Sequence, residues 1–175
     1  ELMVQGRAKE LKNALFNAGE VRPDSIKSIT EIREKLKPVE MGVSWPWPYL
    51  TQLTYGIRTK QIYTFGAGSG IGKTEVLGQV QTHLVKSGEK IGIISFEQTP
   101  QENLIRLLGS YTGQRLHVPG AELDMDNLNP IMDTLSEKVY WYDHFGSCDL
   151  ENTLSKIRYM VKGLGIKYIF LDHLT

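Results

Sequence analysis

The sequence predicts an α/β fold in which a parallel sheet is flanked by helices, and three observations indicate it. Short apolar segments with the composition of buried strands recur along the chain, and segments with helical spacing separate them. A glycine-rich loop joins the first predicted strand to the helix that follows it. Such alternation is typical of βαβ units, whose strands pair in parallel. The predicted strands are residues 61–65, 90–96, 138–142 and 167–172.

Three longer helices and one short helix are predicted between these strands. Residues 73–86 form the first, and Ser87-Gly88 ends it. Pro100 lies in the first turn of the second, which extends to about residue 111. We expect a loop and a short helix in the more irregular residues 116–137. The third helix covers residues 149–162, and its apolar face consists of Leu150, Leu154, Ile157 and Val161.

Two short helices are predicted before this core. Residues 5–18 have helical spacing and stop at Gly19. Ser28 and Glu31 have the form of a capping box, which begins a helix that ends before Pro38. Helices of this length are not stable alone in water, so we expect them to dock on the main domain or on another subunit. The second helix carries a narrow apolar stripe of Ile29, Ile32 and Leu36, and the Trp/Pro-rich residues 41–48 are expected to be extended.

Composition and charge limit the possible functions. The 175 residues include 41% hydrophobic and 23% charged residues, which is normal for a globular domain. No apolar run approaches the length of a membrane span, and no signal peptide is present. Because the formal net charge is zero, any nucleic-acid surface must be local or lie outside this chain. The single cysteine, Cys148, excludes an internal disulfide. Since the chain starts at Glu1 and stops at Thr175, we expect a fragment.

The glycine-rich loop has the pattern of a P-loop and is the strongest functional signal. In a P-loop, backbone N–H groups surround the phosphates of a nucleotide, and the helix N-terminus adds positive potential. Lys73 is expected to reach the β- and γ-phosphates, and the Thr74 hydroxyl is expected to bind Mg²⁺. Ala67 stands where the general pattern has glycine, and a fortuitous glycine-rich turn is the alternative. The predicted nucleotide-binding residues are Ala67, Gly68, Ser69, Gly70, Ile71, Gly72, Lys73 and Thr74.

Two carboxylates that follow buried strands are the predicted partners of this loop. Asp172 ends the last strand, where the carboxyl ends of parallel strands face a ligand crevice. Its distance in sequence from Lys73 fits the Walker-B role, in which an aspartate holds the Mg²⁺ shell, and a cap for the next turn is the alternative. Glu97 follows the strand at residues 90–96 and is predicted to orient the water that attacks the γ-phosphate. The alternative for Glu97 is an exposed carboxylate near a helix start.

The remaining histidines and arginines give weaker signals. We expect His83 to face solvent from its helix. Surface roles are the default for Arg106 and Arg115, with a contact to nucleotide or to a neighbour as the alternative. His173 either senses the nucleotide or makes a structural hydrogen bond. Structural or loop roles are favoured for the residues that lack metal-ligand spacing, which are His117, Asp143 and His144.

Three motifs taken together indicate a family. They are a P-loop whose first residue is small but not glycine, then Phe96-Glu97-Gln98, then Leu171-Asp172-His173-Leu174. This combination resembles the helicase half of phage primase-helicases and their mitochondrial relative Twinkle, which are DnaB-like ring helicases with a RecA-type core. Asn17-Ala18-Gly19 and the stretch at residues 142–165 also resemble the phage proteins, so the resemblance covers essentially the whole chain. Ala67 is then no defect, because that family often lacks the first glycine.

The resemblance implies an incomplete RecA-like P-loop NTPase core preceded by linker helices. Residues 1–20 would be the tail of a primase-like domain, residues 21–48 a linker with an oligomerisation helix, and residues 49–175 the N-terminal half of the ATPase core. ATP, or another NTP or dNTP, would bind with Mg²⁺ between the subunits of a hexameric ring. Its hydrolysis would drive movement 5′ to 3′ along single-stranded DNA, through parts mostly beyond Thr175.

The same resemblance implies replisome partners and no membrane contact. It places the protein in the cytoplasm of a phage-infected bacterium or, for a Twinkle-like protein, in the mitochondrial matrix. Two other functions stay open: a RecA-like recombinase or loader ATPase, and a non-catalytic assembly fragment that donates a linker helix. Beyond Thr175, a further strand ending in His or Gln, followed by an arginine near the subunit boundary, would favour the helicase over these two functions.

Overall fold

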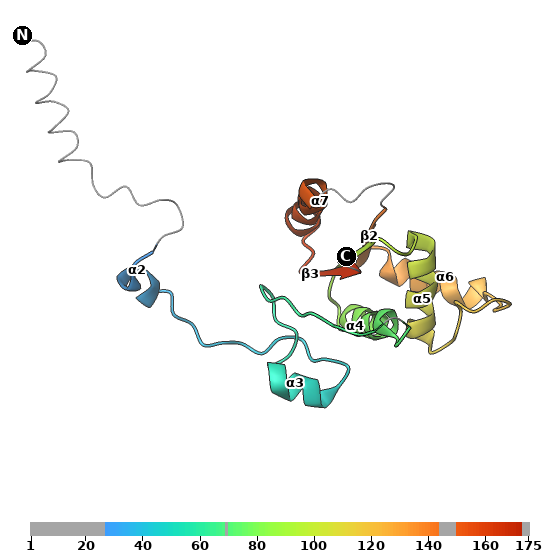
Figure 1. Ribbon diagram of the computed structural model, residues 1–175, viewed down its shortest axis with the longest axis horizontal. Coiled ribbons are helices and arrows are strands. Elements are labelled where there is room, and N and C mark those ends of the chain that lie inside the picture. Colours follow the sequence, from blue (N-terminus) through green and yellow to red (C-terminus); the bar gives the residue numbers. More distant parts are fainter. Residues whose placement is uncertain (1–26, 69, 144–149, 173–175) are drawn as a thin grey trace, which may run out of the picture. The chain divides into compact units, whose positions relative to one another are not determined.

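The computed structural model describes residues 27–68, 70–143 and 150–172, and Figure 1 shows its elements. The chain divides into two compact units, Glu1–Glu40 and Met41–Thr175. In these described ranges no helix has the length and apolarity of a membrane span. The first unit contains α2 (Ile29–Arg33). The second contains α3 (Pro48–Thr54), α4 (Lys73–Lys86), β1 (Ile91–Ser95), α5 (Pro100–Thr112), α6 (Met125–Leu135), β2 (Val139–Tyr142), α7 (Leu150–Gly163) and β3 (Tyr168–Asp172).

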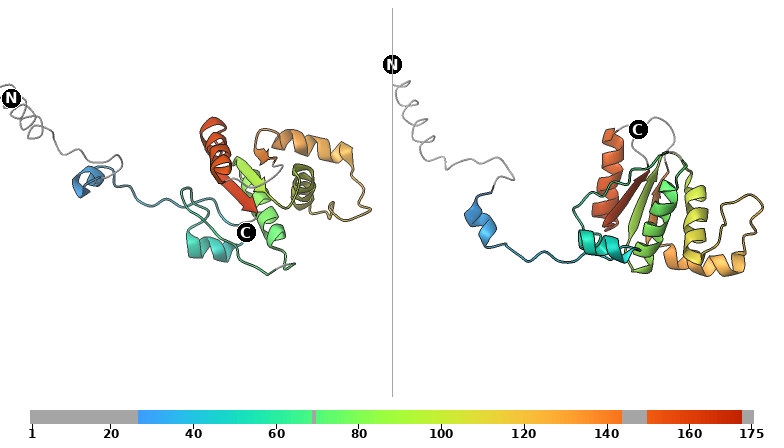
Figure 2. Two further views of the ribbon diagram at one scale, coloured as in Figure 1. Left: turned by 45° about the horizontal axis from the view of Figure 1, so that its top comes forward. Right: turned by 60° about the horizontal axis from the view of Figure 1, so that its bottom comes forward.

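The sheet has three parallel strands in the order β2-β1-β3. Ile91 of β1 pairs with Val139 of β2 and with Tyr168 of β3, so the three strands start level with one another. The chain steps from β1 to β2 in one direction and then returns across β1 to β3. Because parallel crossovers are right-handed, reversing the step also reverses the face that the connecting helix covers. Figure 2 shows this result, with α7 on one face of the sheet and α4 and α5 on the other.

β1 forms the centre of the core. All five residues of β1 are buried, as expected for a central parallel strand that is covered on both faces. Leu84 of α4 belongs to the same buried cluster. Gly92 permits the close approach of α7, because a Cβ at that position would lie 2.8 Å from Met160 Sδ and 2.8 Å from Ile169 Cδ1. The parallel α/β arrangement predicted from the sequence is therefore confirmed.

The strand predicted at residues 61–65 is wrong, because these residues form no strand in the structure. Tyr63 and Phe65 do alternate with exposed residues, but their rings pack edge-on against Trp45 at centroid distances of 5.0 Å and 5.7 Å. The Tyr63 hydroxyl donates to the carbonyl oxygen of Gly56 at 3.0 Å. A strand also needs a ladder of backbone hydrogen bonds with a neighbour, and none forms here among the described residues. The glycine loop therefore follows a packed loop.

The segment predicted to be extended at residues 41–48 runs into a helix that was not predicted, α3. Pro48 occupies the first helical position, where its missing N–H is not needed, and Tyr55 ends the helix with φ 59°. Trp45 is only 4% exposed, and its Nε1–H donates to Thr54 Oγ1 at 2.7 Å. This buried ring anchors α3 to the core.

The apolar face predicted for α7 is only partly correct. Leu150, Leu154 and Val161 are 68%, 40% and 45% exposed. The buried residues are instead Thr153 and Met160. The buried side of α7 is therefore the side next to the predicted stripe.

The helix predicted at residues 29–36 is present but shorter. Its capping box is formed, since Ser28 Oγ accepts from the Glu31 N–H at 3.4 Å and Glu31 Oε2 accepts from the Ser28 N–H at 2.6 Å. The helix ends at Arg33 with no buried residue. The helix predicted at residues 5–18 lies outside the described residues. The apolar side chains of residues 29–36 are exposed, at 86% for Ile29, 46% for Ile32 and 73% for Leu36.

Candidate nucleotide-binding site

The glycine loop leads directly into α4. Gly70 and Gly72 have φ values of 75° and 98°, in the left-handed region that glycine tolerates. Gly72 is the N-cap of α4, and no side chain caps this helix end. The N–H groups of a first turn lack partners within the helix, so this end suits an anion. The predicted loop residues Ala67, Gly68, Gly70, Ile71 and Gly72 are exposed, and Ser69 lies outside the described residues.

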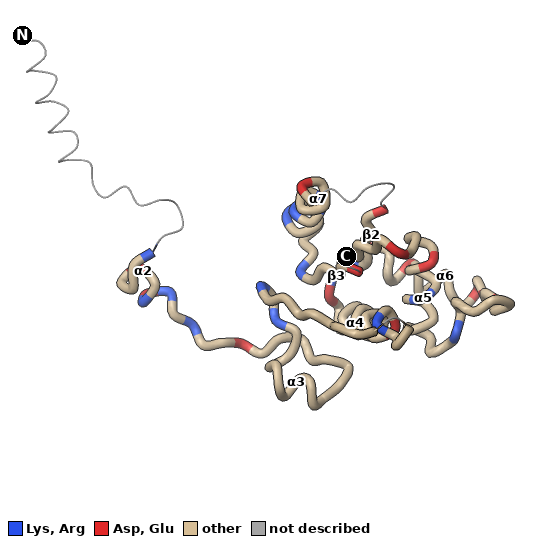
Figure 3. The backbone as a smooth tube through the Cα atoms, in the orientation of Figure 1, with Lys and Arg blue, Asp and Glu red and all other residues tan. Residues whose placement is uncertain are grey.

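The segment that leads into α4 carries only positive charge. Residues 41–72 contain Arg58 and Lys60 and no aspartate or glutamate. Figure 3 shows the absence of acidic residues along this stretch. The segment itself therefore adds no carboxylate that would repel an anion.

Asp172 joins the loop to the sheet through two contacts. Lys73 Nζ lies 3.7 Å from Asp172 Oδ1, and the Thr74 hydroxyl donates to Asp172 Oδ2 at 3.3 Å. Thr74 and Asp172 are 98 positions apart, so only the fold brings them together. Asp172 is 8% exposed as a residue, whereas the Lys73 side chain keeps 28% of its surface accessible. A buried carboxylate and a partly accessible ammonium thus meet at the start of α4.

Asp172 also has an oxygen without a hydrogen-bond partner, which is a feature expected of a metal site. Its Oδ1 is buried and accepts no hydrogen bond from the described residues, and Lys73 at 3.7 Å is too distant to donate one. A cation or its bound water would supply the missing partner. No group of three or more His, Cys, Asp or Glu that could hold a metal occurs among the described residues. One carboxylate and the hydroxyl of Thr74 fit Mg²⁺, which takes few protein ligands and completes its shell with water and phosphate.

Glu97 lies at the same edge of the sheet as Asp172. Ser95 pairs with Asp172 in register, and the Phe96 N–H donates to the carbonyl oxygen of Asp172 at 2.9 Å. On the other side of Glu97, the Gln98 N–H donates to Ser95 Oγ at 3.1 Å. The side chain of Glu97 is exposed, two residues beyond the end of β1. Contacts before and after it therefore hold the backbone that carries Glu97 at the carboxyl edge.

Comparison with known proteins identifies the family of this chain. The family described as DnaB-like helicase C terminal domain matches residues 42–175. The chain belongs to this family. The matched range contains the glycine loop, Glu97 and Asp172, and it begins just beyond the first compact unit. The predicted resemblance to DnaB-like helicases and the predicted RecA-like fold are confirmed.

Two individual proteins are similar to nearly the whole DnaB-like chain. The DNA helicase/primase of Enterobacteria phage T3 is 24% identical over 188 residues, which cover 100% of this chain and 33% of that protein. A solved structure of a DnaB-like replicative helicase, described with its interactions with primase, has a TM-score of 0.59 and 18% identity. The match covers 97% of this chain and 44% of that one. The chain therefore spans less than half the length of these relatives, and the structural likeness supports the fold.

His83 and Asp143 are two of the polar residues with weaker sequence signals that the structure describes. His83 does not simply face solvent, because it is half-buried and its Nε2 lies within hydrogen-bond distance of Ser44 Oγ, at 3.1 Å. Its helix packs against the segment at residues 41–48, a contact that the sequence pattern does not show. Asp143 is exposed, and His144 and His173 lie outside the described residues.

Three other residues gather in a way that the sequence analysis missed. Arg106 of α5 lines a pocket with Arg115 and His117, which come from the loop after α5, and with Glu75 of α4. No spacing rule could have grouped them, because the loop must fold back along α5 to bring them to α4.

Proposed function

We propose that this DnaB-like chain binds and hydrolyses a nucleoside triphosphate with Mg²⁺ as part of a replicative DNA helicase. The observation that supports this most is the meeting of Lys73, Thr74 and Asp172 at the uncapped start of α4. An ammonium, a hydroxyl and a carboxylate are the set with which P-loop NTPases hold the γ-phosphate and its metal. Membership of the helicase family supports the same function.

Each side chain has a separate task in this proposal. The Lys73 ammonium binds the β- and γ-phosphates, and the N–H groups of the loop surround them. Thr74 and Asp172 hold Mg²⁺ directly or through water, and the bound ion neutralises charge on the phosphates. Glu97 orients the attacking water and accepts its proton, which requires a carboxylate that water can reach.

The proposed hydrolysis drives a hexameric ring 5′ to 3′ along single-stranded DNA. Family membership and the T3 helicase/primase support the motor, and the neighbour described with primase supports a primase partner. The exposed apolar side chains of α2 support the assignment of residues 21–48 to an oligomerisation linker. In this proposal residues 1–20 are a primase-like tail and residues 49–175 are the N-terminal half of the ATPase core. The phage relative favours the bacterial cytoplasm over the mitochondrial matrix. A protein that sediments only as a monomer with nucleotide and DNA would contradict the ring.

The substitution Lys73→Ala tests the phosphate site. Nucleotide binding and hydrolysis should be lost, because the charge on the β- and γ-phosphates loses its main side-chain partner. The measurements are Mg·ATP titration and DNA-stimulated hydrolysis by the protein that contains this chain. Lys90→Ala, which removes an exposed lysine just before β1, is the matched control and should behave as wild type. Normal hydrolysis by a folded Lys73→Ala variant would refute the proposal.

A further inference from the structure

Two side chains hold the turn that carries Glu97. Ser95 is the last residue of β1 and is only 8% exposed, and its Oγ accepts from the Gln98 N–H at 3.1 Å. This bond joins the residues on either side of Glu97. At the outgoing end of the turn, Asn103 Nδ2 of α5 donates to the carbonyl oxygens of Thr99 at 3.1 Å and Gln98 at 3.4 Å. Side-chain hydrogen bonds therefore hold the backbone both before and after the carboxylate.

These side chains act where the backbone pairing of the sheet ends. The Phe96 N–H makes the last backbone hydrogen bond between the edge of β1 and β3, to the carbonyl oxygen of Asp172 at 2.9 Å. Within the described residues, the Gln98 N–H donates to no backbone carbonyl, so Ser95 Oγ is its partner. Alanine at position 95 would remove that partner, and the turn would have to change conformation or bind water to satisfy the N–H.

The conformation of this turn matters because the Glu97 side chain is exposed, so the backbone beneath it largely determines where the carboxylate lies. A general base acts within hydrogen-bond reach of the proton that it accepts, about 2.6–3.2 Å between heavy atoms. A displacement of about 1 Å can slow a reaction by roughly 10²-fold. A side chain that fixes this backbone can therefore change the rate without touching the nucleotide.

We propose that Ser95 and Asn103 are positioning residues for nucleotide hydrolysis and that they act on turnover through Glu97. The inference rests on the proposed function of the phosphate site. The described hydrogen bonds of the two side chains reach only Gln98 and Thr99. Nucleotide affinity is then independent of both side chains, whereas turnover depends on them.

The substitution Ser95→Ala tests this role in the protein that contains this chain. Turnover should fall roughly tenfold, because Asn103 and the cap of α5 still hold part of the turn. The dissociation constant of Mg·ATP should stay within about threefold of wild type. Ser95→Thr keeps the hydroxyl in a residue that strands favour and should restore most of the turnover. Asn103→Ala should lower turnover to a smaller extent, again with unchanged affinity, since the Ser95 bond remains.

A second background separates positioning from a general loss of structure. If Ser95 acts through Glu97, then Ser95→Ala should change turnover by less than about twofold in a protein that already carries Glu97→Gln. A general structural defect would lower turnover by the same factor in both backgrounds. Asn103→Ala should show the same dependence on Glu97.

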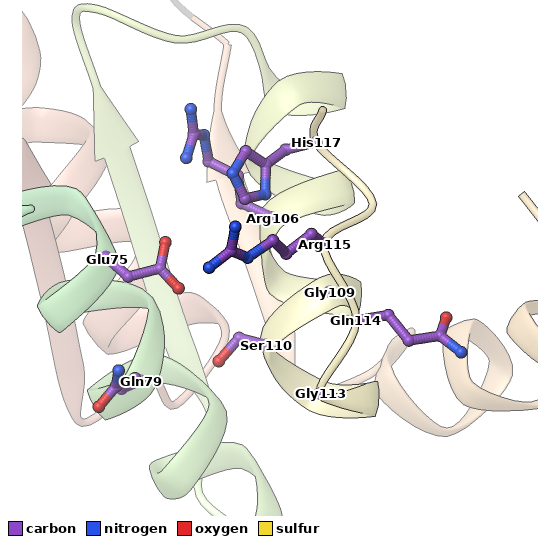
Figure 4. Close-up of a pocket in the computed structure, with 9 residues that line it drawn as sticks. All are labelled: Glu75, Gln79, Arg106, Gly109, Ser110, Gly113, Gln114, Arg115 and His117. Atoms are coloured by element: carbon purple, nitrogen blue, oxygen red, sulfur yellow. The ribbon is translucent and has the colours of Figure 1, made fainter. Parts of the chain in front are cut away.

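The matched control is Ser110→Ala, the same substitution at another serine that bonds to the backbone. Ser110 of α5 is half-buried, and its Oγ donates to the carbonyl oxygen of Gly78 at 3.5 Å. Figure 4 shows this side chain pointing toward α4. The control should have wild-type turnover, and thermal melting of every variant measures how much stability each substitution removes.

The outcomes separate this inference from the proposed function. Normal turnover in folded Ser95→Ala, while Glu97→Gln is slow, overturns the positioning role alone. An equal loss in both backgrounds, or a loss matched by Ser110→Ala, overturns it as well. If Ser95→Ala does not fold, the same measurements on Asn103→Ala decide. Normal turnover in Glu97→Gln removes the base that the two residues would position, and unchanged hydrolysis in Lys73→Ala refutes the proposed function itself.

Discussion

Asp172 and Glu97 are carboxylates at the ends of neighbouring parallel strands, yet their surroundings differ. Asp172 is 8% exposed and contacts both Lys73 and Thr74. Glu97 lies two residues beyond β1, and its side chain is exposed. The two positions share a backbone link, since the Phe96 N–H donates to the carbonyl oxygen of Asp172. One sheet edge thus provides a carboxylate held by the protein and a second that solvent reaches.

This difference suits two tasks within one reaction. A carboxylate that holds a metal must keep its geometry before the ligand arrives, and neighbouring side chains provide that support. A carboxylate that accepts a proton from water must be reached by water. We therefore expect substitutions at Asp172 and Glu97 to change different steps, and the following predictions test that separation.

The largest effect is expected from Glu97→Gln, which keeps size and polarity but removes the charge. Turnover should fall by roughly 10²-fold, because the attacking water loses its base. Binding of Mg·ATP should stay within about threefold of wild type. Steady-state hydrolysis and nucleotide titration on the same samples measure both, with Glu137→Gln as a control at another exposed glutamate. Normal turnover in Glu97→Gln would place the base elsewhere.

A smaller effect, on the Mg²⁺ concentration needed for nucleotide binding, is expected from Asp172→Asn. The amide can still accept from the Thr74 hydroxyl, but it lacks the charge that attracts Mg²⁺ and Lys73. The Mg²⁺ concentration at half-maximal nucleotide binding should rise about tenfold or more. A Mg²⁺ titration at constant nucleotide measures it, and thermal melting checks that the variant is folded. An unchanged midpoint would remove Asp172 from the metal site.

The smallest effect is expected from Thr99→Ala, which removes the side-chain cap of α5, the helix that follows Glu97. Thr99 Oγ1 accepts from the Glu102 N–H at 3.3 Å, and Glu102 Oε2 accepts from the Thr99 N–H at 2.8 Å. Losing this cap should lower the free energy of unfolding by about 1 kcal/mol, measured by urea denaturation. Turnover should fall modestly while the Mg²⁺ midpoint stays constant. A shifted midpoint would show that the two carboxylates are not independent.

The same cap predicts a pH dependence. Hydrogen bonds from the Thr99 backbone N–H and hydroxyl hold the pKa of Glu102 below its ordinary value. A carboxyl whose pKa is lower in the folded state stabilises the fold above its unfolded pKa and loses that contribution as pH falls through the folded pKa. The stability difference between wild type and Thr99→Ala should therefore narrow in acid. A difference that stays constant down to full protonation of Glu102 would contradict this account.

Elements with local signals could be predicted from the sequence. α4 begins at Lys73 because a glycine loop precedes it, and α5 begins at Pro100 because Thr99 and Glu102 cap it. The absence of a strand at residues 61–65 could not be predicted in the same way. The alternation of Tyr63 and Phe65 is the same whether a neighbouring strand or the ring of Trp45 covers them.

The face of α7 and the pocket beside α4 could not be predicted for related reasons. An apolar stripe indicates that a helix is amphipathic, but the packing of α7 decides which side is buried, and here that side carries Thr153 and Met160. The sequence places Arg115 forty positions from Glu75, and only the return of the loop along α5 brings both to one pocket.

The sequence by itself determined the glycine loop, the helix caps and the two carboxylates at the ends of strands, because each depends on the conformation of a few consecutive residues. Tertiary structure decided which distant groups meet. It joined Asp172 to Lys73 and Thr74, left Glu97 exposed beside them, and placed Glu75 opposite Arg115. The physical reason is that backbone hydrogen bonds and caps act within a turn or two. The distance between residues far apart in the chain depends instead on how helices and strands bury their apolar faces.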